Sequence, residues 1–410
     1  MAKKPNIRFA GFEDDWEQRK LGELGEILTG STPSTSNSAY YSEDGIPWVT
    51  PTDINELTIS DTPRKLSEEG AKVGRVVPAN TILCTCIASI GKNTLLTVKG
   101  SFNQQINSLT PYDENDAYFL LTDSEIWSNT MKRMAASGTM QIVNKTEFSE
   151  LKTMVPSLVE QQAIGTYFHN LDHLITLHQR KCDELKKVKK FMLQKMFPKK
   201  GEKNPEIRFD GFTNDWEQRK LGEVCVRVTR KNKNNESDLP LTIASQYGLI
   251  DQRDFFNKVI AAKDMSNYYL LKKGEFAYNK SYSKGFDYGS IKRLNVYEQG
   301  CLSTLYICFS IETDEVDSDY LECFFDTLSW YHDVSAICAE GARNHGLLNV
   351  DVKAFFKDVN IEMPSQIQEQ RKISVFINTI DHLITLHQRK CEELKNVKKY
   401  MLQNMFAKGE

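Results

Sequence analysis

The sequence predicts a mixed α/β protein that is built twice, as two α/β units separated by two long helices. Two segments are nearly identical in the two halves of the chain, and they lie at 15–23 and 215–223 and at 172–182 and 381–391. The stretches between them, about 24–155 and 224–362, barely resemble each other. Internal repetition of this kind indicates a duplicated fold. A shared frame with two different insertions indicates one task performed twice, on two different targets.

The second repeated segment lies in a long helix in each half. Residues 160–197 carry apolar side chains in a heptad pattern with polar exceptions at His178 and Lys189, and Pro156 lies just before them. Such a pattern, sustained over several heptads, is typical of a coiled-coil seam. The predicted seam consists of Ile164, Phe168, Leu171, Ile175, Leu185 and Met192 in the first helix and of Ile373, Ile377, Ile380, Ile384, Leu394 and Met401 in the second.

These seams predict that the two helices pair as an antiparallel coiled coil. A narrow seam needs a partner, and about 38 residues at 1.5 Å each give a rod of roughly 57 Å. Antiparallel rods would hold the two variable units apart. The alternative is a helical hairpin inside one compact core. Against it, a whole variable unit rather than a short loop separates the helices.

The repeat also predicts domain boundaries and a pseudo-two-fold, pseudo-circular arrangement. We expect a first α/β domain at 1–157, a central helix at 158–200, a second α/β domain at 201–365 and a C-terminal helix at 366–410. Because residues 203–214 follow the first helix, repeat symmetry predicts that residues 3–14 pack at the end of the second helix.

The composition is that of a folded protein that does not cross a membrane. The chain of 410 residues is 40% hydrophobic and 26% charged, and no apolar run approaches the ~20 residues that span a bilayer. Nine scattered cysteines without a CxxC pair favour reduced structural thiols over a metal site, and therefore a cytoplasmic location. A net charge of −3 argues against coating nucleic acid by charge alone but permits a local basic groove.

Two polar features of the helices have a structural and a functional interpretation. His178 and His387 occupy matching seam positions, and we interpret them as packed seam residues because no second set of metal ligands accompanies them. The run Lys186, Lys187, Lys189 and Lys190 is typical of a solvated helix face. A docking surface for a partner protein is the alternative.

Each variable unit is predicted to close with a strand, a helix, a glycine-containing turn and a last strand. In the first unit, strands are expected at 81–90 and 94–98 and a helix at about 115–136. In the second, a helix at about 317–338 precedes the turn EGARNHGLLN. The variation falls in exposed connections, where binding residues usually lie.

Amide, hydroxyl, aromatic and basic side chains in these connections are the candidate binding residues. Short hydroxyl and amide groups can donate and accept hydrogen bonds at base edges, arginine and lysine pair with guanine, and lysine also meets phosphates. The candidate DNA contacts are Thr32, Ser34, Gln104, Gln105, Thr139, Gln141 and Lys145 in the first unit and Gln246, Tyr247, Lys280, Tyr282, Lys284, Arg343, Asn344 and His345 in the second. Each also has a structural explanation, because such residues form and cap turns.

Taken in order, these motifs resemble the specificity subunits of type I restriction–modification systems over essentially the whole chain. The motifs are the paired WEQRKLGE openings, the loop GSTPSTSN before IPWVTPTDI, the SGT-x-Q turn before NKTEF, the EGARNHGLLN turn, and the EQ helix entries after Pro156 and Pro364. The resemblance implies two target-recognition domains and a coiled coil that sets the gap between two DNA half-sites.

The resemblance also implies partners. They are double-stranded DNA, two adenine-N6 methyltransferase subunits and, in the restriction form, two ATP-driven motor–nuclease subunits. S-adenosylmethionine, ATP and magnesium would then belong to those partners, and this chain would hold no cofactor or metal and catalyse nothing.

The sequence itself carries none of the motifs for this chemistry. A methyltransferase segment would read Asn/Asp-Pro-Pro-aromatic, and Asn204-Pro205-Glu206 stops after one proline. A phosphate loop needs a first glycine and a final hydroxyl, and the stretch around Gly91 and Lys92 lacks both. Two alternatives to a non-catalytic reader stay open: a stand-alone DNA endonuclease with duplicated recognition domains, and a helical adaptor that binds only proteins.

Overall fold

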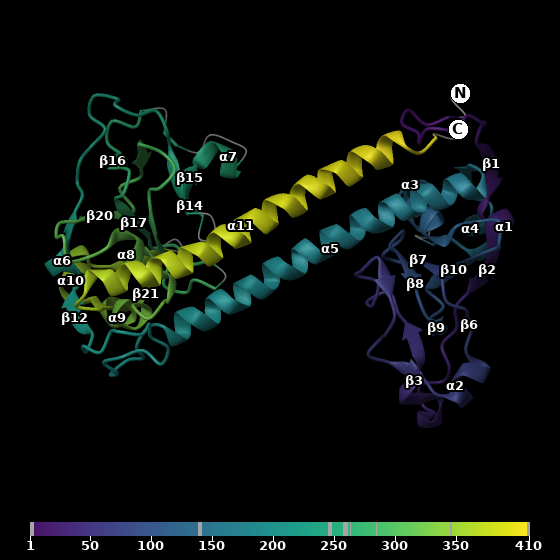
Figure 1. Cartoon of the computed structure of the whole chain (residues 1–410), viewed down its shortest axis with the longest axis horizontal. Coiled ribbons are helices and arrows are strands. Elements are labelled where there is room, and N and C mark those ends of the chain that lie inside the picture. Colours follow the sequence, from purple (N-terminus) through teal and green to yellow (C-terminus); the bar gives the residue numbers. More distant parts are fainter. Residues whose placement is uncertain are drawn as a thin grey trace. The chain divides into compact units, whose positions relative to one another are not determined.

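The computed structural model describes residues 4–137, 142–244, 248–256, 261–262, 264–283, 285–344 and 347–407, with only the backbone of 137, 339–344 and 347. The chain forms two compact units (Figure 1). Unit 1 comprises Met1–Arg180 and Gln388–Glu410, and unit 2 comprises Lys181–His387. Each unit therefore contains one α/β domain and a segment of both long helices.

The α/β domain of unit 1 is built on two sheets. The larger has the strand order β2-β10-β7-β8-β4, in which β10 pairs antiparallel with β2 and β7, and β4 pairs parallel with β8. The smaller has the order β5-β3-β9-β6, and β1 pairs separately with β11. The strands are β1 (Glu17–Lys20), β2 (Gly25–Thr29), β3 (Tyr41–Val49), β4 (Thr58–Ile59), β5 (Lys65–Leu66), β6 (Val76–Val77), β7 (Thr81–Thr85), β8 (Asn93–Leu96), β9 (Gly100–Phe102), β10 (Ile106–Pro111) and β11 (Lys152–Val155).

One long helix covers the larger sheet of unit 1. Helix α3 (Ala117–Ser137) packs against β7 and β8, and its apolar side chains join a core around Trp16, Trp127 and Phe148. The strand expected at 81–90 ends at Thr85, because the chain turns through a left-handed residue, Ala88, with φ 61°. The short helices are α1 (Leu21–Leu24), η1 (Ser38–Tyr40), α2 (Glu68–Val73) and α4 (Lys145–Ser149).

Unit 2 repeats the frame with different sheets. Strand β12 pairs with β23 as β1 pairs with β11, and the largest sheet has the order β13-β20-β17-β18. The strands are β12 (Glu217–Lys220), β13 (Cys225–Arg227), β14 (Leu241–Ala244), β15 (Gly248–Asp251), β16 (Tyr269–Lys272), β17 (Phe276–Asn279), β18 (Ser290–Arg293), β19 (Gln299–Leu302), β20 (Ile307–Ile311), β21 (Cys338–Asn344), β22 (Leu347–Val350) and β23 (Asn360–Met363). The helices are α6 (Leu221–Val224), α7 (Gln252–Phe256), α8 (Ser318–Asp326), α9 (Tyr331–Ile337) and α10 (Val352–Asp358).

Two expectations for unit 2 are wrong. The single helix expected at about 317–338 is two helices, α8 and α9, because Leu328 takes a left-handed φ of 63°, which a continuous right-handed helix excludes. The break lets Trp330 turn into the core. The segment EGARNHGLLN is not simply a turn, because β21 and β22 pair antiparallel, with Arg343 opposite Leu348.

The two long helices, α5 (Leu158–Lys195) and α11 (Ile367–Asn404), begin in the same way. The glutamine of each EQ motif points back to the domain: Gln161 Oε1 accepts from Asp116 N at 3.0 Å, and Gln370 Oε1 accepts from Asp317 N at 2.9 Å. Each glutamine thereby ties the first turn of a long helix to the start of α3 or α8.

The glutamate of each EQ motif holds the segment that precedes the domain. Arg8 donates to both carboxylate oxygens of Glu160, at 2.6 and 2.7 Å, and Arg208 repeats this on Glu369 at 2.7 and 2.9 Å. Both glutamates are buried, and a two-pronged guanidinium–carboxylate pair fixes orientation as well as distance. The EQ motif therefore has a structural role in both units.

The segments before the two domains also meet helix ends in equivalent ways. Ile7 N donates to the carbonyl of Asn404 at 2.9 Å, and Ile207 N donates to the carbonyl of Lys195 at 2.8 Å. The residues at the start of the chain thus occupy the place at the end of α11 that their repeats occupy at the end of α5. This confirms the pseudo-circular arrangement.

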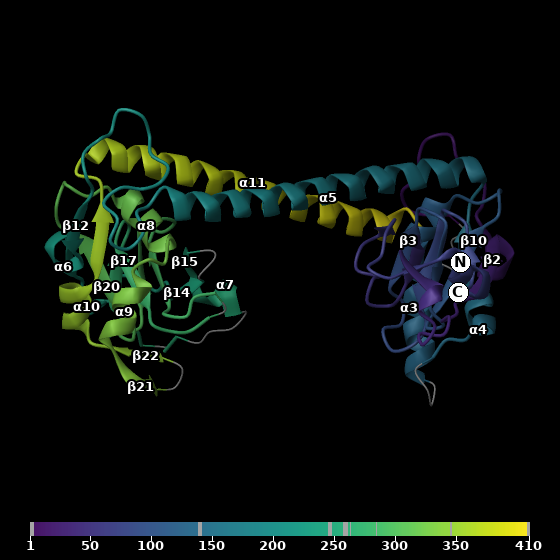
Figure 2. The same cartoon turned by 90° about the horizontal axis from the view of Figure 1, so that it is seen from below.

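Within each unit the two long helices run antiparallel (Figure 2). In unit 1, Lys398 contacts Asp172, and Cys391 contacts Ile175 further along α5. In unit 2, Cys182, Ile380 and Ile384 form a buried cluster with Leu185 against it. The mixed α/β class, with two long helices and a duplicated order of elements, is confirmed.

The predicted seam residues divide into two groups. Ile164 and Phe168 lie in the core of the first domain, and Ile373 and Ile377 lie in the core of the second, because the ends of the helices pack into the domains. Among the others, Leu171, Ile380 and Ile384 are buried and Ile175, Leu185, Met192, Leu394 and Met401 are half-buried. No helix in the described ranges has the length and apolar character to cross a membrane.

Candidate nucleic-acid interface

The first candidate surface lies where the loop after β2 meets the turn before β10. Thr32 Oγ1 donates a hydrogen bond to Gln104 Oε1, so two residues far apart in the sequence meet. The approach depends on Gly30, because a Cβ there would lie 2.1 Å from the carbonyl oxygen of Asn103. Ser34 belongs to the same loop, and its hydroxyl lies 2.8 Å from that of Ser36. Thr32, Ser34 and Gln104 are exposed.

Gln105 lies next to this surface, and Lys145 lies on α4, whose start is held near the Gln105 turn. Gln105 is half-buried, and its backbone carbonyl accepts from Cys86 N at 2.9 Å, while the Cys86 carbonyl accepts from Val143 N at 3.0 Å. This ladder brings the chain just before α4 beside the Gln105 turn. Lys145 is exposed on the first turn of α4, which Asn144 caps.

In unit 2 the structure brings the segment after β17 beside the β21–β22 hairpin. Leu348 N donates to the Lys280 carbonyl at 3.0 Å, and Leu348 is the partner of Arg343 in the hairpin. Burial lowers the pKa of Lys280. Tyr282 follows Lys280 by two positions and is 52% exposed. This edge of the domain therefore carries both an aromatic and a basic side chain.

Several candidate contacts cannot be placed. Thr139, Gln141, Gln246, Tyr247, Lys284 and His345 lie outside the described residues, and Arg343 and Asn344 are described by their backbone alone. Their roles stay predictions, as does DNA contact by the residues that are placed.

Sequence reasoning missed a cavity in unit 2 beside this edge. The cavity has a volume of about 650 Å³ and is lined by α7, by β14, by the end of β17 with the loop after it, and by the loop after β19. Gln252, Phe255 and Phe256 of α7 contribute to it. The sequence feature that could have indicated this cavity is the pair of adjacent phenylalanines in the polar stretch QRDFF.

A second missed feature is an ion network where the helices meet the domains. Lys189 Nζ lies 2.8 Å from Asp326 of α8 and 2.7 Å from Asp381 of α11. Burial lowers the pKa of Lys189, but the two carboxylates more than offset this and raise it overall. Lys292 also reaches Asp326 at 2.6 Å, so this half-buried carboxylate has two cations. The solvated face expected for the lysine run is therefore wrong for Lys189.

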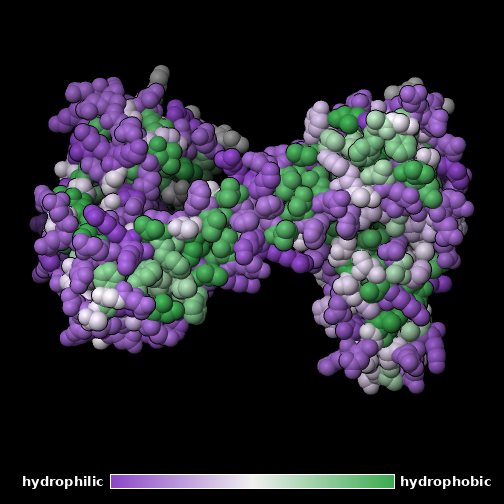
Figure 3. Space-filling model, in the orientation of Figure 1, coloured by the Kyte–Doolittle hydropathy of each residue, from purple (hydrophilic) through white to green (hydrophobic). Residues whose placement is uncertain are grey.

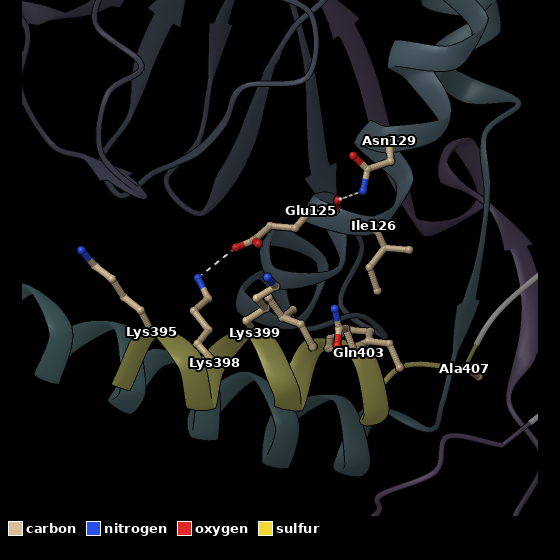
Figure 4. Close-up of a pocket in the computed structure, with 10 residues that line it drawn as sticks. Glu125, Ile126, Asn129, Lys395, Lys398, Lys399, Gln403 and Ala407 are labelled. Atoms are coloured by element: carbon tan, nitrogen blue, oxygen red, sulfur yellow. Dashed lines mark hydrogen bonds and ion pairs between the residues drawn. The ribbon is translucent and has the colours of Figure 1, made fainter. Parts of the chain in front are cut away.

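Unit 1 repeats the network. Lys398 lies 2.9 Å from both Asp172 and Glu125, and Figure 4 shows Lys398 reaching from α11 toward Glu125. These residues stand beside a groove of about 460 Å³ between α3 and the end of α11. Lys189 and Lys398 occupy equivalent positions in the repeat.

The described residues show no cluster of three or more histidine, cysteine, aspartate or glutamate side chains that could hold a metal. All nine cysteines are free, and eight are buried. Burial raises the pKa of the Cys225 and Cys308 thiols to about 12, which makes them poor nucleophiles.

Known proteins similar to this chain agree on one family. Residues 13–187 match the family model described as "Type I restriction modification DNA specificity domain". The chain is 35% identical over 148 residues to the type I restriction enzyme HindI specificity subunit of Haemophilus influenzae, covering 35% of this chain and 32% of that protein. It is 30% identical over 229 residues to the MjaIX specificity subunit of Methanocaldococcus jannaschii, covering 51% of each. The chain thus spans about a third to a half of the length of these relatives.

A solved structure resembles the fold of nearly the whole chain. A crystal structure of the type I restriction–modification S subunit from M. genitalium superimposes with a TM-score of 0.66 at 13% identity, covering 99% of this chain and 100% of that one. Both curated relatives are named as specificity subunits rather than as methyltransferases or nucleases. Residues 13–187 therefore match a type I restriction–modification DNA specificity domain, and the chain has the fold of the M. genitalium S subunit.

Proposed function

We propose that the chain is the DNA-reading subunit of a type I restriction–modification enzyme and that it reads an asymmetric bipartite target, one half-site per unit. The observation that carries this is the repeated frame around two different domains. The pairs β1–β11 and β12–β23 and the two EQ helix entries are built alike, while the sheets between them differ. A shared frame with different sheets suits two readers of different sequence.

The two long helices would set the gap between the half-sites. Their antiparallel contacts within each unit and their equal lengths of 38 residues support this role. The buried networks at Lys189 and Lys398 support it further, because they tie both helices to α8 in unit 2 and to α3 in unit 1.

The helices also offer a place for partner subunits. Each unit exposes five large apolar side chains on its helix segments, and they are Val159, Leu174, Leu177, Val397 and Tyr400 in unit 1 and Val188, Phe191, Val375, Leu383 and Leu386 in unit 2. Figure 3 shows apolar side chains at the surface of the helices. Exposed apolar patches mark interaction sites. Two equivalent faces suit two methyltransferase subunits, one on each.

The chemistry would come from those partners. S-adenosylmethionine would bind the methyltransferase subunits, and ATP and magnesium would bind two motor–nuclease subunits in a restricting complex. The assembly would act on DNA in the cytoplasm.

Mapping methylated adenines in a host genome with and without the gene tests the proposal. We expect one two-part motif to lose its methylation when the gene is deleted. If the methylation pattern is unchanged, the chain does not direct a methyltransferase.

The alternatives have their own discriminators. Purified chain that cuts DNA with magnesium alone would favour the stand-alone endonuclease. Binding to protein partners without any sequence preference on DNA would favour the adaptor.

A further inference from the structure

The α7 cavity of unit 2 combines the three elements that a nucleobase site needs. Its volume of about 650 Å³ lies within the range of ligand pockets, roughly 300–1,000 Å³. Its lining mixes aromatic rings with small hydroxyl and amide groups. The aromatic members are Phe255, Phe256, Tyr268, Tyr282, Phe286 and Tyr306.

The aromatic residues at the cavity are unusually exposed. Phe255 and Phe256 are 47% and 41% exposed, and their rings meet edge to face with centroids 4.7 Å apart. Large rings that remain open beside a cavity leave apolar surface for a flat ligand to cover. Bases stack favourably on such rings.

One polar atom at the cavity lacks a partner. Gln252 Oε1 is buried, and no hydrogen bond from the described residues reaches it. A buried acceptor without a donor is destabilising, so a ligand that brings an N–H group gains a hydrogen bond there. Gln252 N already donates to the Pro240 carbonyl at 2.8 Å, which fixes the start of α7 against the cavity wall.

The cavity also adjoins the candidate DNA-reading edge. Asn279, Ser281 and Tyr282 line it, and they flank or include Lys280 and Tyr282, two of the predicted contacts. Ser281 N donates to Asn279 Oδ1 at 3.0 Å, so this short segment is held in place at the mouth. A base that leaves the duplex there would meet the rings directly.

We propose that this cavity binds one unstacked base of the recognised DNA, a base that carries an exocyclic amino group. Phe255 and Phe256 supply apolar ring surface, and Gln252 Oε1 accepts a hydrogen bond from the amino group. The inference rests on the proposed DNA-reading function and adds a base-capture site to unit 2. Adenine, cytosine and guanine fit this chemistry, whereas thymine has no exocyclic amino group.

The test uses the full chain alone, so that no base is captured by a methyltransferase partner. Once the target is mapped, each base in the half-site of unit 2 is left unpaired in turn by an abasic site on the opposite strand. A protein that captures a base binds such a duplex more tightly, because the unpairing energy has already been supplied. We expect a gain of about tenfold at one adenine, cytosine or guanine and none at a thymine, equivalent to about 1.4 kcal/mol.

Two variants and a control locate the effect. Phe255→Ala and Gln252→Leu should each remove the gain at that position and leave the fold intact, because Phe255 is a surface residue and the Gln252 amide oxygen has no partner among the described residues. Tyr112→Ala in unit 1, where the ring is 48% exposed, should keep the gain.

The outcomes separate this inference from the proposed function. Sequence-specific binding with no gain at any position, or a gain that persists in both variants, overturns the base-capture site and leaves the DNA-reading function standing. Absence of sequence-specific binding by the wild-type chain overturns both.

Discussion

Lys189 donates a hydrogen bond to Asp381 at 2.7 Å, from one long helix to the other within unit 2. The same ammonium reaches Asp326 of α8 at 2.8 Å, so a single side chain joins both helices to the domain. Lys398 does the same in unit 1 with Asp172 and Glu125.

Lys189→Met should destabilise unit 2 by about 3 kcal/mol, the lower end of the range for a broken buried ion pair, because Lys292 still neutralises part of the Asp326 charge. Thermal and denaturant unfolding of the full chain measure the change. The neighbouring exposed variant Lys190→Met should stay within about 0.5 kcal/mol of wild type. Equal losses in both variants would mean that the buried network adds nothing.

Asp123→Asn should change how stability depends on pH. Asp123 is buried on α3 and accepts from Thr153 Oγ1 at 2.6 Å, and burial raises the pKa of its carboxyl to about 7 from an ordinary 3.8. Between these two values the folded state holds a proton that the unfolded state has lost, so stability falls as pH rises from about 4 to 7. The fall is roughly 4 kcal/mol.

Asparagine cannot titrate, so this fall should disappear in Asp123→Asn while the hydrogen bond to Thr153 is kept. Unfolding curves at pH values from 4 to 8 give the comparison. The exposed substitution Asp113→Asn serves as the control and should keep the wild-type slope. A stability difference between the wild-type chain and Asp123→Asn that stays constant through this window would show that Asp123 is ionised in the fold.

A circular permutant should fold. The bond between Ile7 N and the Asn404 carbonyl repeats the bond between Ile207 N and the Lys195 carbonyl, so the chain ends are positioned like an ordinary internal connection. Joining residue 410 to residue 1 through a short linker and opening the chain at the exposed Gly201 should give a protein with near-wild-type melting temperature and unchanged DNA target. Aggregation of the permutant, with a folded linear control, would contradict the equivalence of the two connections.

The proposed role of the helices as a spacer predicts the effect of lengthening both. One heptad inserted after His178 and one after His387 adds about 10.5 Å to each helix and preserves the apolar repeat. At about 3.4 Å per base pair, the gap between half-sites should grow by about three base pairs, with both half-sites unchanged. Insertions of two residues serve as the contrast, because they rotate the seam and should impair assembly. An active lengthened chain with the original gap would mean that the helices do not set it.

The repeated parts of the fold were predictable and the junctions were not. Heptad spacing places Ile380 and Ile384 correctly, because it reports a local helical period. The break at Leu328 depends on burying Trp330 in a core assembled from distant strands, and no local pattern carries that information. Lys189 looked like one of a solvated run because its partner Asp326 is far away in the sequence.

The candidate site divides in the same way. The residue types in the sequence identified the loops as candidate binding regions. The hydrogen bond between Thr32 and Gln104 shows that two of these loops meet in the fold. The cavity beside α7 was missed because its walls come from segments that are separate in the sequence. A phenylalanine pair in sequence also does not reveal whether it is buried or open. Which of these side chains contacts a base stays a prediction.

Exchange of one variable domain tests the central claim most directly. Residues 24–155 of this chain are replaced by the equivalent stretch of another specificity subunit, and methylated adenines are mapped in cells that carry the hybrid and the matching methyltransferase. The account predicts that one half-site changes to that of the donor while the other half-site and the gap stay the same. A hybrid that methylates a target with both halves changed, or that keeps both original halves, would contradict the assignment of one half-site to each unit.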